Sequence, residues 1–307
     1  MFSIKLSPHI FLIDLKPRGL KRFIASYVIR AKKIAIIETG PKATIPNLLA
    51  GLKEIDVDLT HIDYIMISHI HLDHGGGAGS LLRHLPNAKL VVHKRGIFHI
   101  SNPQKLWVQS RQVLNTIARL YQEPTPVAPK RIITAEDGMT FDLGDGIELR
   151  VIETLGHSSH HQSFYEKRSQ SIFPGDTAGV YLQEFNVTIP TTPPPFHFEK
   201  TLASIKKLKQ LNPKLLYYSH FGQAANAVEK LQSYIDQLKL WANVISKKRI
   251  KESTLEEIRE EIEKSDPALR NISKYVKTHL FMNKGTIPQS IEGFNKYFEF
   301  IEKKANA

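Results

Sequence analysis

The feature that most constrains this chain is a run of eight residues, Ser-His-Ile-His-Leu-Asp-His-Gly at positions 68–75, which holds four candidate metal ligands. The apolar residues before the run predict a strand, and its last residue is the first of three consecutive glycines. Successive side chains of a strand point to opposite faces, so His69 and His71 point the same way and can bind one ion. Asp73 and His74 lie just past the strand end and can face a second ion. Because such residues are costly to bury without a partner, the run predicts a metal site.

Three further candidate ligands, His157, Asp176 and His220, each follow an apolar segment that predicts a strand. A glycine turn precedes His157, a Pro-Gly pair precedes Asp176, and the run Leu-Leu-Tyr-Tyr-Ser precedes His220. Strand ends are where a sheet presents its loops, and functional side chains concentrate on such loops. The sequence therefore predicts a site that is built at the ends of several strands.

The order and spacing of these residues resemble the metallo-β-lactamase fold over roughly residues 8 to 222. The resemblance implies an α/β protein with the αββα sandwich of that fold. It implies a first ion held by His69, His71 and His157, a second ion held by Asp73, His74 and His220, and a bridge between them through Asp176. No ligand position is substituted, and His71 argues against the flavodiiron branch, which has an acid there.

Other residues concern the surroundings of these ligands. Many relatives have Asp-Thr-Gly where this chain has Glu-Thr-Gly at positions 38–40, a mild change that leaves no ligand in doubt. The His-rich stretch 156–163 resembles the glyoxalase-II-like hydrolase and lactonase branches. In it, His160 or His161 can orient a ligand, with a surface or helix-capping role as the alternative. Asp63, which precedes the metal strand, is a further candidate to hydrogen-bond a ligand histidine.

Length and hydropathy predict a catalytic domain over residues 1–222 and a helical extension over residues 223–307. The chain has 307 residues, of which 41% are apolar, so it can bury a large core. After position 222, apolar residues recur at alternating spacings of three and four, which is typical of amphipathic helices. We expect these helices to pack on the catalytic domain. A contact with a second copy of the chain in a homodimer is the alternative.

Composition excludes several classes of protein. The chain has no cysteine, so it forms no disulfide and uses no thiolate as ligand or nucleophile. No apolar stretch approaches the roughly 20 residues of a membrane span. The first residues, Met-Phe-Ser-Ile-Lys, lack the core of a signal peptide. We therefore expect a cytoplasmic protein with no membrane partner.

The chain carries a formal net charge of +12, and its distribution matters more than its size. Residues 200–307 contain 20 Lys or Arg and 12 Asp or Glu, so +8 of the charge lies in the last third. No motif that binds RNA or DNA accompanies it, and solvated helix faces explain it. The alternative is a field that attracts anionic substrates.

The chemistry follows from the two ions. Ions about 3.5–4 Å apart can share a water and lower its pKa, so that a metal-bridging hydroxide attacks the substrate. Asp73 can accept a proton from that water and pass it to the leaving group. We predict a dinuclear metal-dependent hydrolase of broad specificity that acts on small esters, lactones or phosphoesters, including phosphodiesters and phosphotriesters. His and carboxylate ligands suit zinc, the first expectation, and also iron, manganese or cobalt.

The substrate is expected to be a small molecule in a cleft near the Pro-Pro-Pro run at positions 193–195. Three aromatic residues are the predicted walls of that cleft: Tyr181, Phe196 and Phe221. The glyoxalase II branch reads glutathione through basic and Tyr residues in a C-terminal helical region. Those residues do not map onto this chain, so thioester hydrolysis stays open.

Two alternatives come from other classes of protein. A mononuclear iron enzyme of the persulfide dioxygenase type uses two His and one Asp, and the complete set of seven ligands argues against it. A nucleic-acid-processing or nucleic-acid-binding protein is the second alternative. Nuclease relatives usually insert a second domain before the last histidine, but only 43 residues separate Asp176 from His220.

Overall fold

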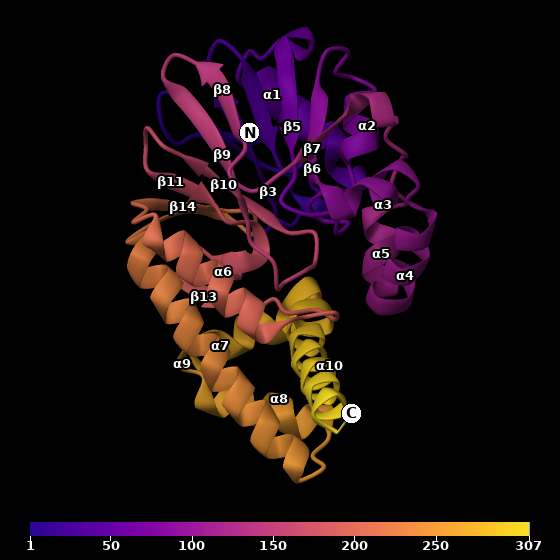
Figure 1. Ribbon diagram of the computed structural model, residues 1–307, viewed down its shortest axis with the longest axis vertical. Helices are drawn as coiled ribbons and strands as arrows, with labels where there is room; N and C mark the ends of the chain where they lie inside the picture. The colour runs from indigo at the N-terminus through magenta and orange to yellow at the C-terminus, as the bar shows by residue number, and fades with distance from the viewer. Residues whose placement is uncertain (307) are drawn as a thin grey trace.

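Two β-sheets pack face to face in this protein, and helices cover the outer faces (Figure 1). The computed structural model describes residues 1–306. The architecture is the αββα sandwich predicted from the sequence, and a helical region follows it at the C-terminal end. In Figure 1 the sandwich occupies the upper part of the molecule and the C-terminal helices lie below it.

The first sheet contains seven strands in chain order: β1 (Ser3–Lys5), β2 (Ile10–Asp14), β3 (Ala25–Arg30), β4 (Ile34–Ile37), β5 (Ile62–Met66), β6 (Lys89–His93) and β7 (Ile132–Ala135). Strands β1 to β4 pair antiparallel, and β4 to β7 pair parallel. Parallel neighbours need crossover connections, which contain α1 (Ile45–Glu54) and α2 (Ala78–Leu82). The last crossover contains α3 (Ile97–Ser101), α4 (Gln104–Leu114) and α5 (Thr116–Tyr121), which lie together at one side of the molecule (Figure 1).

The second sheet contains six strands in the order β15-β14-β11-β10-β9-β8. Their bounds are β8 (Thr140–Gly144), β9 (Ile147–Glu153), β10 (Gln162–Glu166), β11 (Ser171–Phe173), β14 (Leu215–Tyr218) and β15 (Gly222–Ala225). Between β11 and β14 the chain forms a small sheet of β12 (Val180–Leu182) and β13 (Val187–Ile189), and then helix α6 (Phe198–Gln210). The loops after β5, β9, β11 and β14 carry the candidate ligands.

The alternation of side chains along the strands separates two apolar cores. In β2, Ile10 and Leu12 point into the core between the sheets, whereas Phe11 and Ile13 point toward the helices outside. A strand buried on both faces has no polar side, which is why this segment reads as a continuous apolar run. The inter-sheet core also contains large rings such as Phe164, and it holds the two sheets in a fixed relation.

The C-terminal region consists of α7 (Ala227–Ile250), α8 (Leu255–Ser265), α9 (Pro267–Thr278), a π-helical turn η7 (Met282–Thr286) and α10 (Ile287–Ala305). The Ser290 hydroxyl donates to the Pro190 carbonyl at 2.9 Å and accepts from the Thr192 amide at 3.1 Å. Gly293 lies so close to the Thr192 carbonyl that a side chain would not fit there without movement. Helix α10 is therefore docked on the loop after β13.

The domain boundary drawn at residue 222 stays a prediction, and strand β15 continues the second sheet to Ala225. Within residues 1–306, no helix combines the length and the apolar character needed to cross a bilayer.

Candidate metal centre

The structure brings all seven candidate ligands together at one edge of the sandwich. Their ligand atoms form three compact groups, each with its atoms within 4.8 Å of one another. The groups are His69, His71 and His157; Asp73, His74 and His220; and His69, His74 and Asp176. The first two are the sets that the family resemblance implies, and the third contains the residue expected to bridge them.

The first group points its nitrogen atoms at a common centre. The Nδ1 atom of His71 lies 2.9 Å from His69 Nε2 and 3.1 Å from His157 Nε2. Ligand nitrogens on one tetrahedral ion, at bond lengths of about 2.0–2.1 Å, lie roughly 3.3 Å apart. The spacing of these nitrogens is therefore close to that of ligands around a single ion.

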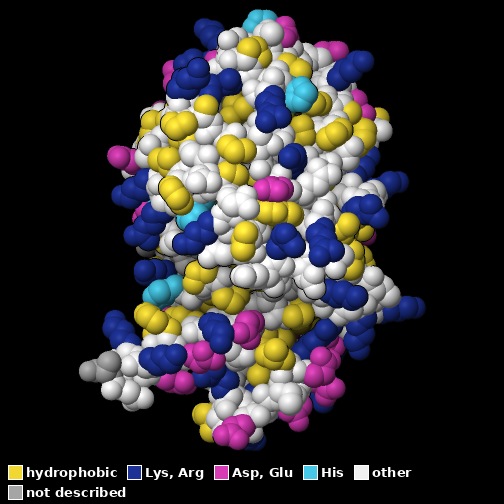
Figure 2. Space-filling view, turned by 90° about the vertical axis from the view of Figure 1, so that its right-hand side faces the viewer, with side chains coloured by type: hydrophobic (Ala, Val, Ile, Leu, Met, Phe, Trp, Pro, Cys, Tyr) yellow, Lys and Arg dark blue, Asp and Glu magenta, His cyan; other side chains and the backbone are white. Residues whose placement is uncertain are grey.

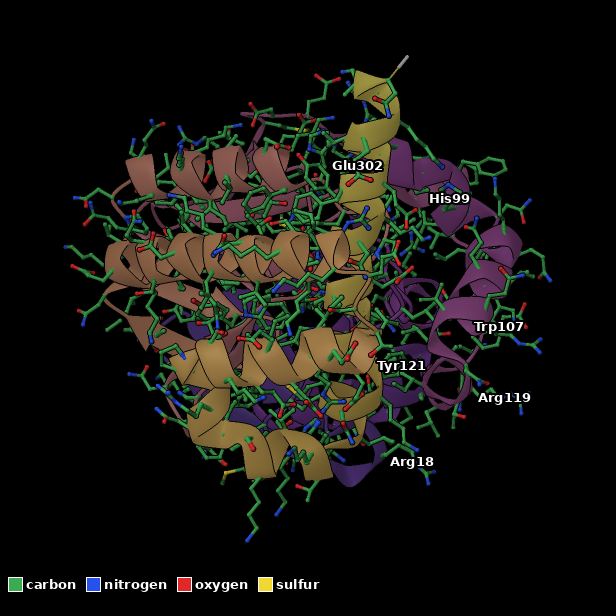
Figure 3. The ribbon with its side chains drawn as sticks, turned by 90° about the horizontal axis from the view of Figure 1, so that it is seen from below. Arg18, His99, Trp107, Arg119, Tyr121 and Glu302 are labelled. Carbon is green, nitrogen blue, oxygen red and sulfur yellow. The ribbon has the colours of Figure 1, made fainter. Side chains whose placement is uncertain are left out.

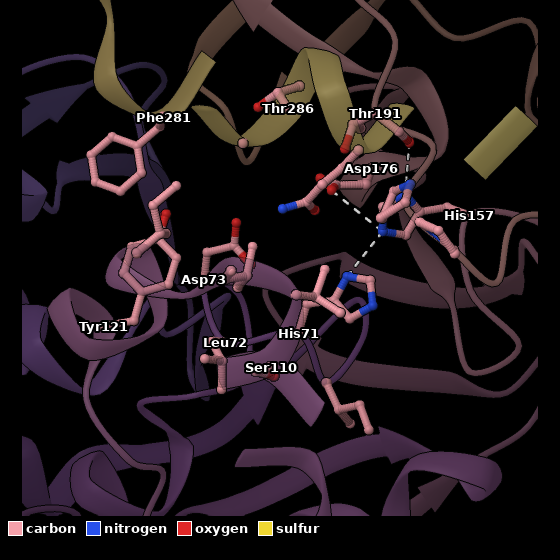
Figure 4. Close-up of a pocket in the computed structure, with 18 of the residues that line it drawn as sticks. His71, Leu72, Asp73, Ser110, Tyr121, His157, Asp176, Thr191, Phe281 and Thr286 are labelled. Carbon is pink, nitrogen blue, oxygen red and sulfur yellow. Dashed lines mark hydrogen bonds and ion pairs between the residues drawn. The ribbon is translucent and has the colours of Figure 1, made fainter. Parts of the chain in front are cut away.

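Asp176 faces both groups with its two carboxylate oxygens. Oδ1 lies 3.2 Å from His74 Nε2 and 3.8 Å from His220 Nε2. Oδ2 lies 3.5 Å from His157 Nε2, on the side of the first group (Figure 4). His220 Nε2 in turn lies 3.6 Å from Asp73 Oδ2. The orientation of Asp176 is that of a carboxylate able to contact two ions.

Hydrogen bonds fix the orientation of four ligand rings through their other nitrogen. His157 Nδ1 donates to the Thr191 carbonyl at 2.9 Å, and His220 Nδ1 donates to the Phe23 carbonyl at 3.2 Å. The remaining two contacts join His74 Nδ1 to Glu38 Oε1 at 3.1 Å and His69 Nδ1 to Ser68 Oγ at 2.9 Å. A ring that donates through Nδ1 keeps its Nε2 lone pair free for an ion.

Glu38 is the carboxylate that supports the second group. It is buried and lies just after β4, where it also accepts from the Ser68 amide at 3.2 Å and from the Ser219 hydroxyl at 3.1 Å. Its backbone has a φ of 64°, a conformation that is strained for a residue with a side chain. The sequence signal was present as an acid before Thr-Gly at a strand end, but its contact with His74 was not predicted.

Asp63, the residue that we considered for this role, lies elsewhere. Its carboxylate accepts from the Ile34 amide at 2.9 Å, near the start of β5. The ligand run follows the far end of the same strand. Asp63 thus faces the wrong end of the sheet to support a ligand.

The two histidines after the third ligand motif have different positions. His161 Nε2 accepts from the Asp176 amide at 3.1 Å, and burial lowers the pKa of His161 well below its usual value. It therefore acts as a neutral acceptor that positions the bridging residue. His160 lines the cleft, where its Nδ1 lies 3.0 Å from Ser158 Oγ, and burial beside other histidines lowers its pKa to about 3.

The charge state of the cluster suits divalent cations. Burial, together with the neighbouring histidines, lowers the pKa values of His69 and His71 well below normal, so both rings offer lone pairs. Burial would raise the pKa of Asp176, but His74 and His157 lower it well below its usual range. Among the residues described, His74 Nε2 and Asp176 Oδ1 are buried without any hydrogen-bond partner. Neutral imidazoles and an ionised, unsatisfied carboxylate are a donor set that fits such ions.

A cavity of about 240 Å³ adjoins the ligands. One side is polar and contains His71, Asp73 and Asp176. The opposite side is mostly apolar and comes from α4, α5 and the C-terminal region; it includes Leu106, Val113, Ile117, Tyr121 and Phe281. Figure 4 shows Tyr121 and Phe281 together on one side of the cavity, with His71 and His157 on the other. The Pro run 193–195 borders it as expected.

The three aromatic residues predicted as walls do not line this cavity, which is a correction. The Tyr181 ring stacks on Tyr218 at 4.7 Å, and its hydroxyl donates to Asn186 Oδ1 at 2.8 Å. Phe196 packs against Phe294 of α10 at 4.9 Å. Phe221 belongs to the core between the sheets. Closeness to a ligand in the sequence does not determine the direction of a side chain, and all three point into packed interiors.

The chain belongs to the metallo-β-lactamase superfamily, whose family model matches residues 20–220. The matched segment contains all seven candidate ligands. It ends at His220, before strand β15 and the C-terminal helices.

Individual relatives resemble the chain over most of its length. The metallo-β-lactamase fold-containing protein ST1585 of Sulfurisphaera tokodaii is 29% identical over 225 residues, which cover 71% of this chain and 81% of that protein. The crystal structure of ST1585 superposes with a TM-score of 0.70, covering 94% of this chain and 99% of the other.

Two more proteins extend the comparison. The metallo-β-lactamase family protein TTHA1429 from Thermus thermophilus superposes with a TM-score of 0.70 at 18% identity, covering 97% of this chain and 95% of the other. A hydroxyacylglutathione hydrolase of Prochlorococcus marinus (strain MIT 9301) is 24% identical over 258 residues, which cover 82% of this chain and 77% of the other. The structural match includes the C-terminal helices, so the shared fold extends beyond the segment of the family model.

Proposed function

We propose that this protein is a hydrolase that depends on two divalent metal ions and acts on small esters, lactones or phosphoesters, with thioesters as a further class. The observation that carries the proposal is Asp176, whose two carboxylate oxygens face the two groups of ligands. The superfamily consists mostly of hydrolases. The similarity to a hydroxyacylglutathione hydrolase supports an acyl substrate.

The roles of the residues follow from their positions. His69, His71 and His157 would hold one ion, and Asp73, His74 and His220 the other, with zinc preferred for His and carboxylate ligands. Two divalent ions held there would lower the pKa of a shared water and polarise the substrate oxygen. Asp73, whose side chain is 24% exposed at the cavity, is placed to accept the proton of the water. The oxygen of water bonds to the carbonyl carbon, the bond to the leaving oxygen or sulfur breaks, and that atom takes the proton.

The cavity favours a compact substrate with an apolar group. Leu106, Ile117 and Phe281 offer aliphatic and aromatic surface opposite the ligands. Such a wall binds an acyl or alkyl chain by removing its surface from water. A cavity of about 240 Å³ also limits the size of the group that can reach the metal centre.

The structure supports neither alternative as well. The segment between Asp176 and His220 forms β12, β13 and α6, which leaves no separate domain to bind a nucleic acid there. Both groups of ligands are complete, whereas a mononuclear iron site would leave one of them without a role. The expected cytoplasmic location, the homodimer and the identity of the metal stay predictions.

The test combines metal analysis with a substrate panel. We expect about two metal equivalents per chain in the loaded protein. We also expect hydrolysis of p-nitrophenyl esters, lactones or phosphoesters that disappears on chelation and returns with metal. At most one bound ion, or iron with oxygen uptake and no hydrolysis, would contradict the proposal. Cleavage of RNA or DNA far faster than every small substrate would favour the nucleic-acid alternative.

A further inference from the structure

A second cavity of about 380 Å³ lies beside the metal cleft and is basic in character. We call it the basic cavity. Its charged residues are Lys16, Arg18 and Arg119, and no acidic residue lines it. It shares Tyr121 and Phe281 with the metal cleft. In Figure 3, Arg18 and Arg119 lie on the same side of the molecule, with Tyr121 farther in.

The positive charges in the basic cavity lack carboxylate partners. Neither Arg18 nor Arg119 forms an ion pair with any residue that the structure describes, and both are exposed. The Lys16 ammonium donates to the Met1 carbonyl at 2.6 Å and lies 4.2 Å from the centre of the Phe2 ring. A carbonyl and an aromatic ring hold an ammonium in place without neutralising it. Three positive charges therefore face a cavity with no negative side chain.

The surrounding chain reinforces this charge. Residues 74–122 contain seven Lys or Arg and no Asp or Glu. This stretch includes α3, α4 and α5, which form one side of the metal cleft. Figure 2, which views that side of the molecule, shows Lys and Arg spread over the face, with Asp and Glu gathered mainly toward its lower end. An anion approaching the cleft meets a positive field.

A single pair of stacked rings separates the basic cavity from the metal cleft. Tyr121 and Phe281 lie nearly parallel, with ring centres 5.6 Å apart and 8° between their planes. Asp73 and His220, both of the second ligand group, line the metal cleft together with these rings. A substrate with its reacting bond at the metal centre can thus extend along the rings toward Arg18 and Arg119.

We propose that the basic cavity binds a phosphate group on the alcohol or thiol part of an acyl substrate, while the acyl part occupies the apolar side of the metal cleft. This inference rests on the proposed hydrolase function and adds the substrate class, an acyl ester or thioester of a phosphate-bearing alcohol or thiol. The guanidinium groups of Arg18 and Arg119 provide paired N–H donors that match phosphate oxygens.

The test uses two substrates with the same acyl group and the same reacting bond. Butyryl-coenzyme A carries phosphates on its thiol part, whereas butyryl-N-acetylcysteamine carries none. We expect kcat/KM to be at least about tenfold higher for the first, since a hydrogen bond to a charged group is worth that much or more. The preference should shrink as the salt concentration rises.

Variants locate the effect. Arg18→Gln and Arg119→Gln should each raise KM for butyryl-coenzyme A by about tenfold and leave butyryl-N-acetylcysteamine within about twofold of the wild type. Arg111→Gln is the matched control, because Arg111 lies in the same acid-free stretch, is exposed and lines neither cavity. It should leave both substrates unchanged.

A binding measurement keeps the test independent of turnover. Adenosine 3′,5′-bisphosphate, which has phosphates but no thiol or acyl group, should bind to the metal-loaded wild type in calorimetry and bind at least about tenfold more weakly to the double variant. Equal binding to both proteins overturns the inference. So does equal turnover of the two thioesters, and the hydrolase proposal would survive that result. Tighter binding of a 20-nucleotide single strand, lost in the same variants, would instead assign the cavity to polynucleotides.

Discussion

The metal centre and the apolar side of its cleft are built on opposite principles. Every candidate ligand follows a strand of one of the two packed sheets, and hydrogen bonds through the second nitrogen orient four of the five histidines. The opposite side comes from α4, α5 and the C-terminal turn, where Val113 is 56% exposed although it lines the cavity. One region is rigid and polar, and the other is open and apolar.

The difference separates chemistry from substrate choice. Ligands held by two sheets can keep the geometry that a reaction needs, because sheets move little relative to each other. Helices at the rim can change in sequence without disturbing that geometry. We infer that relatives with this centre differ in substrate mainly through the residues of α4, α5 and the C-terminal region.

The largest expected effect comes from Asp73 in the metal centre. Asp73→Asn preserves shape but removes the charge and the proton acceptor, so kcat for a small ester should fall by at least about 10². Metal analysis of the same sample distinguishes loss of the proton acceptor from loss of an ion. Near-normal turnover with both ions bound would show that Asp73 does not handle the proton.

The next effect concerns the support of the ligands. Glu38→Gln leaves the His74 ring without a charged acceptor, and we expect a loss of about 10–100-fold in metal affinity or activity. Asp63→Asn is the matched control, because Asp63 bonds the Ile34 amide near the start of β5. If the two variants bind metal equally well, the metal centre does not depend on Glu38.

Metal binding should also depend on pH. Burial alone would lower the pKa of His74, but the carboxylates of Asp176 and Glu38 raise it well above its usual value in the metal-free protein. Below that raised pKa the ring carries a proton that an ion must displace, so affinity should fall as the pH falls, by about tenfold per pH unit for one proton. Calorimetry in buffers of different ionisation enthalpy counts the protons released. Binding without proton release would contradict this expectation.

The smallest effect is expected at the apolar side. Val113→Ala removes about one methylene of contact with an acyl chain, which corresponds to a rise in KM of roughly fourfold. The free energy of unfolding should stay within about 0.5 kcal/mol, because Val113 is exposed. Val108→Ala is the control, since Val108 is 44% exposed on the same helix but does not line the cleft. A large loss of stability in Val113→Ala would show that α4 is as tightly packed as the metal centre.

The sequence by itself determined the fold class and the residues that gather at the site. His69 and His71 are two apart at the end of a predicted strand, and a glycine turn follows, so their placement depends on local geometry alone. The same holds for Asp176 and His220, each at the end of an apolar segment. Strand periodicity and turn chemistry act over a few residues, which is why such positions can be predicted from one sequence.

Only the tertiary structure decided what surrounds these ligands. Glu38 meets His74 across 36 positions, and Tyr121 stacks on Phe281, which lies far beyond it in the chain. Tyr181, Phe196 and Phe221 lie near ligands in the sequence, yet each points into a packed interior. Contacts between distant segments depend on how sheets and helices pack, and a local pattern contains no information about that packing. For this reason the ligands were predictable and the walls of the cleft were not.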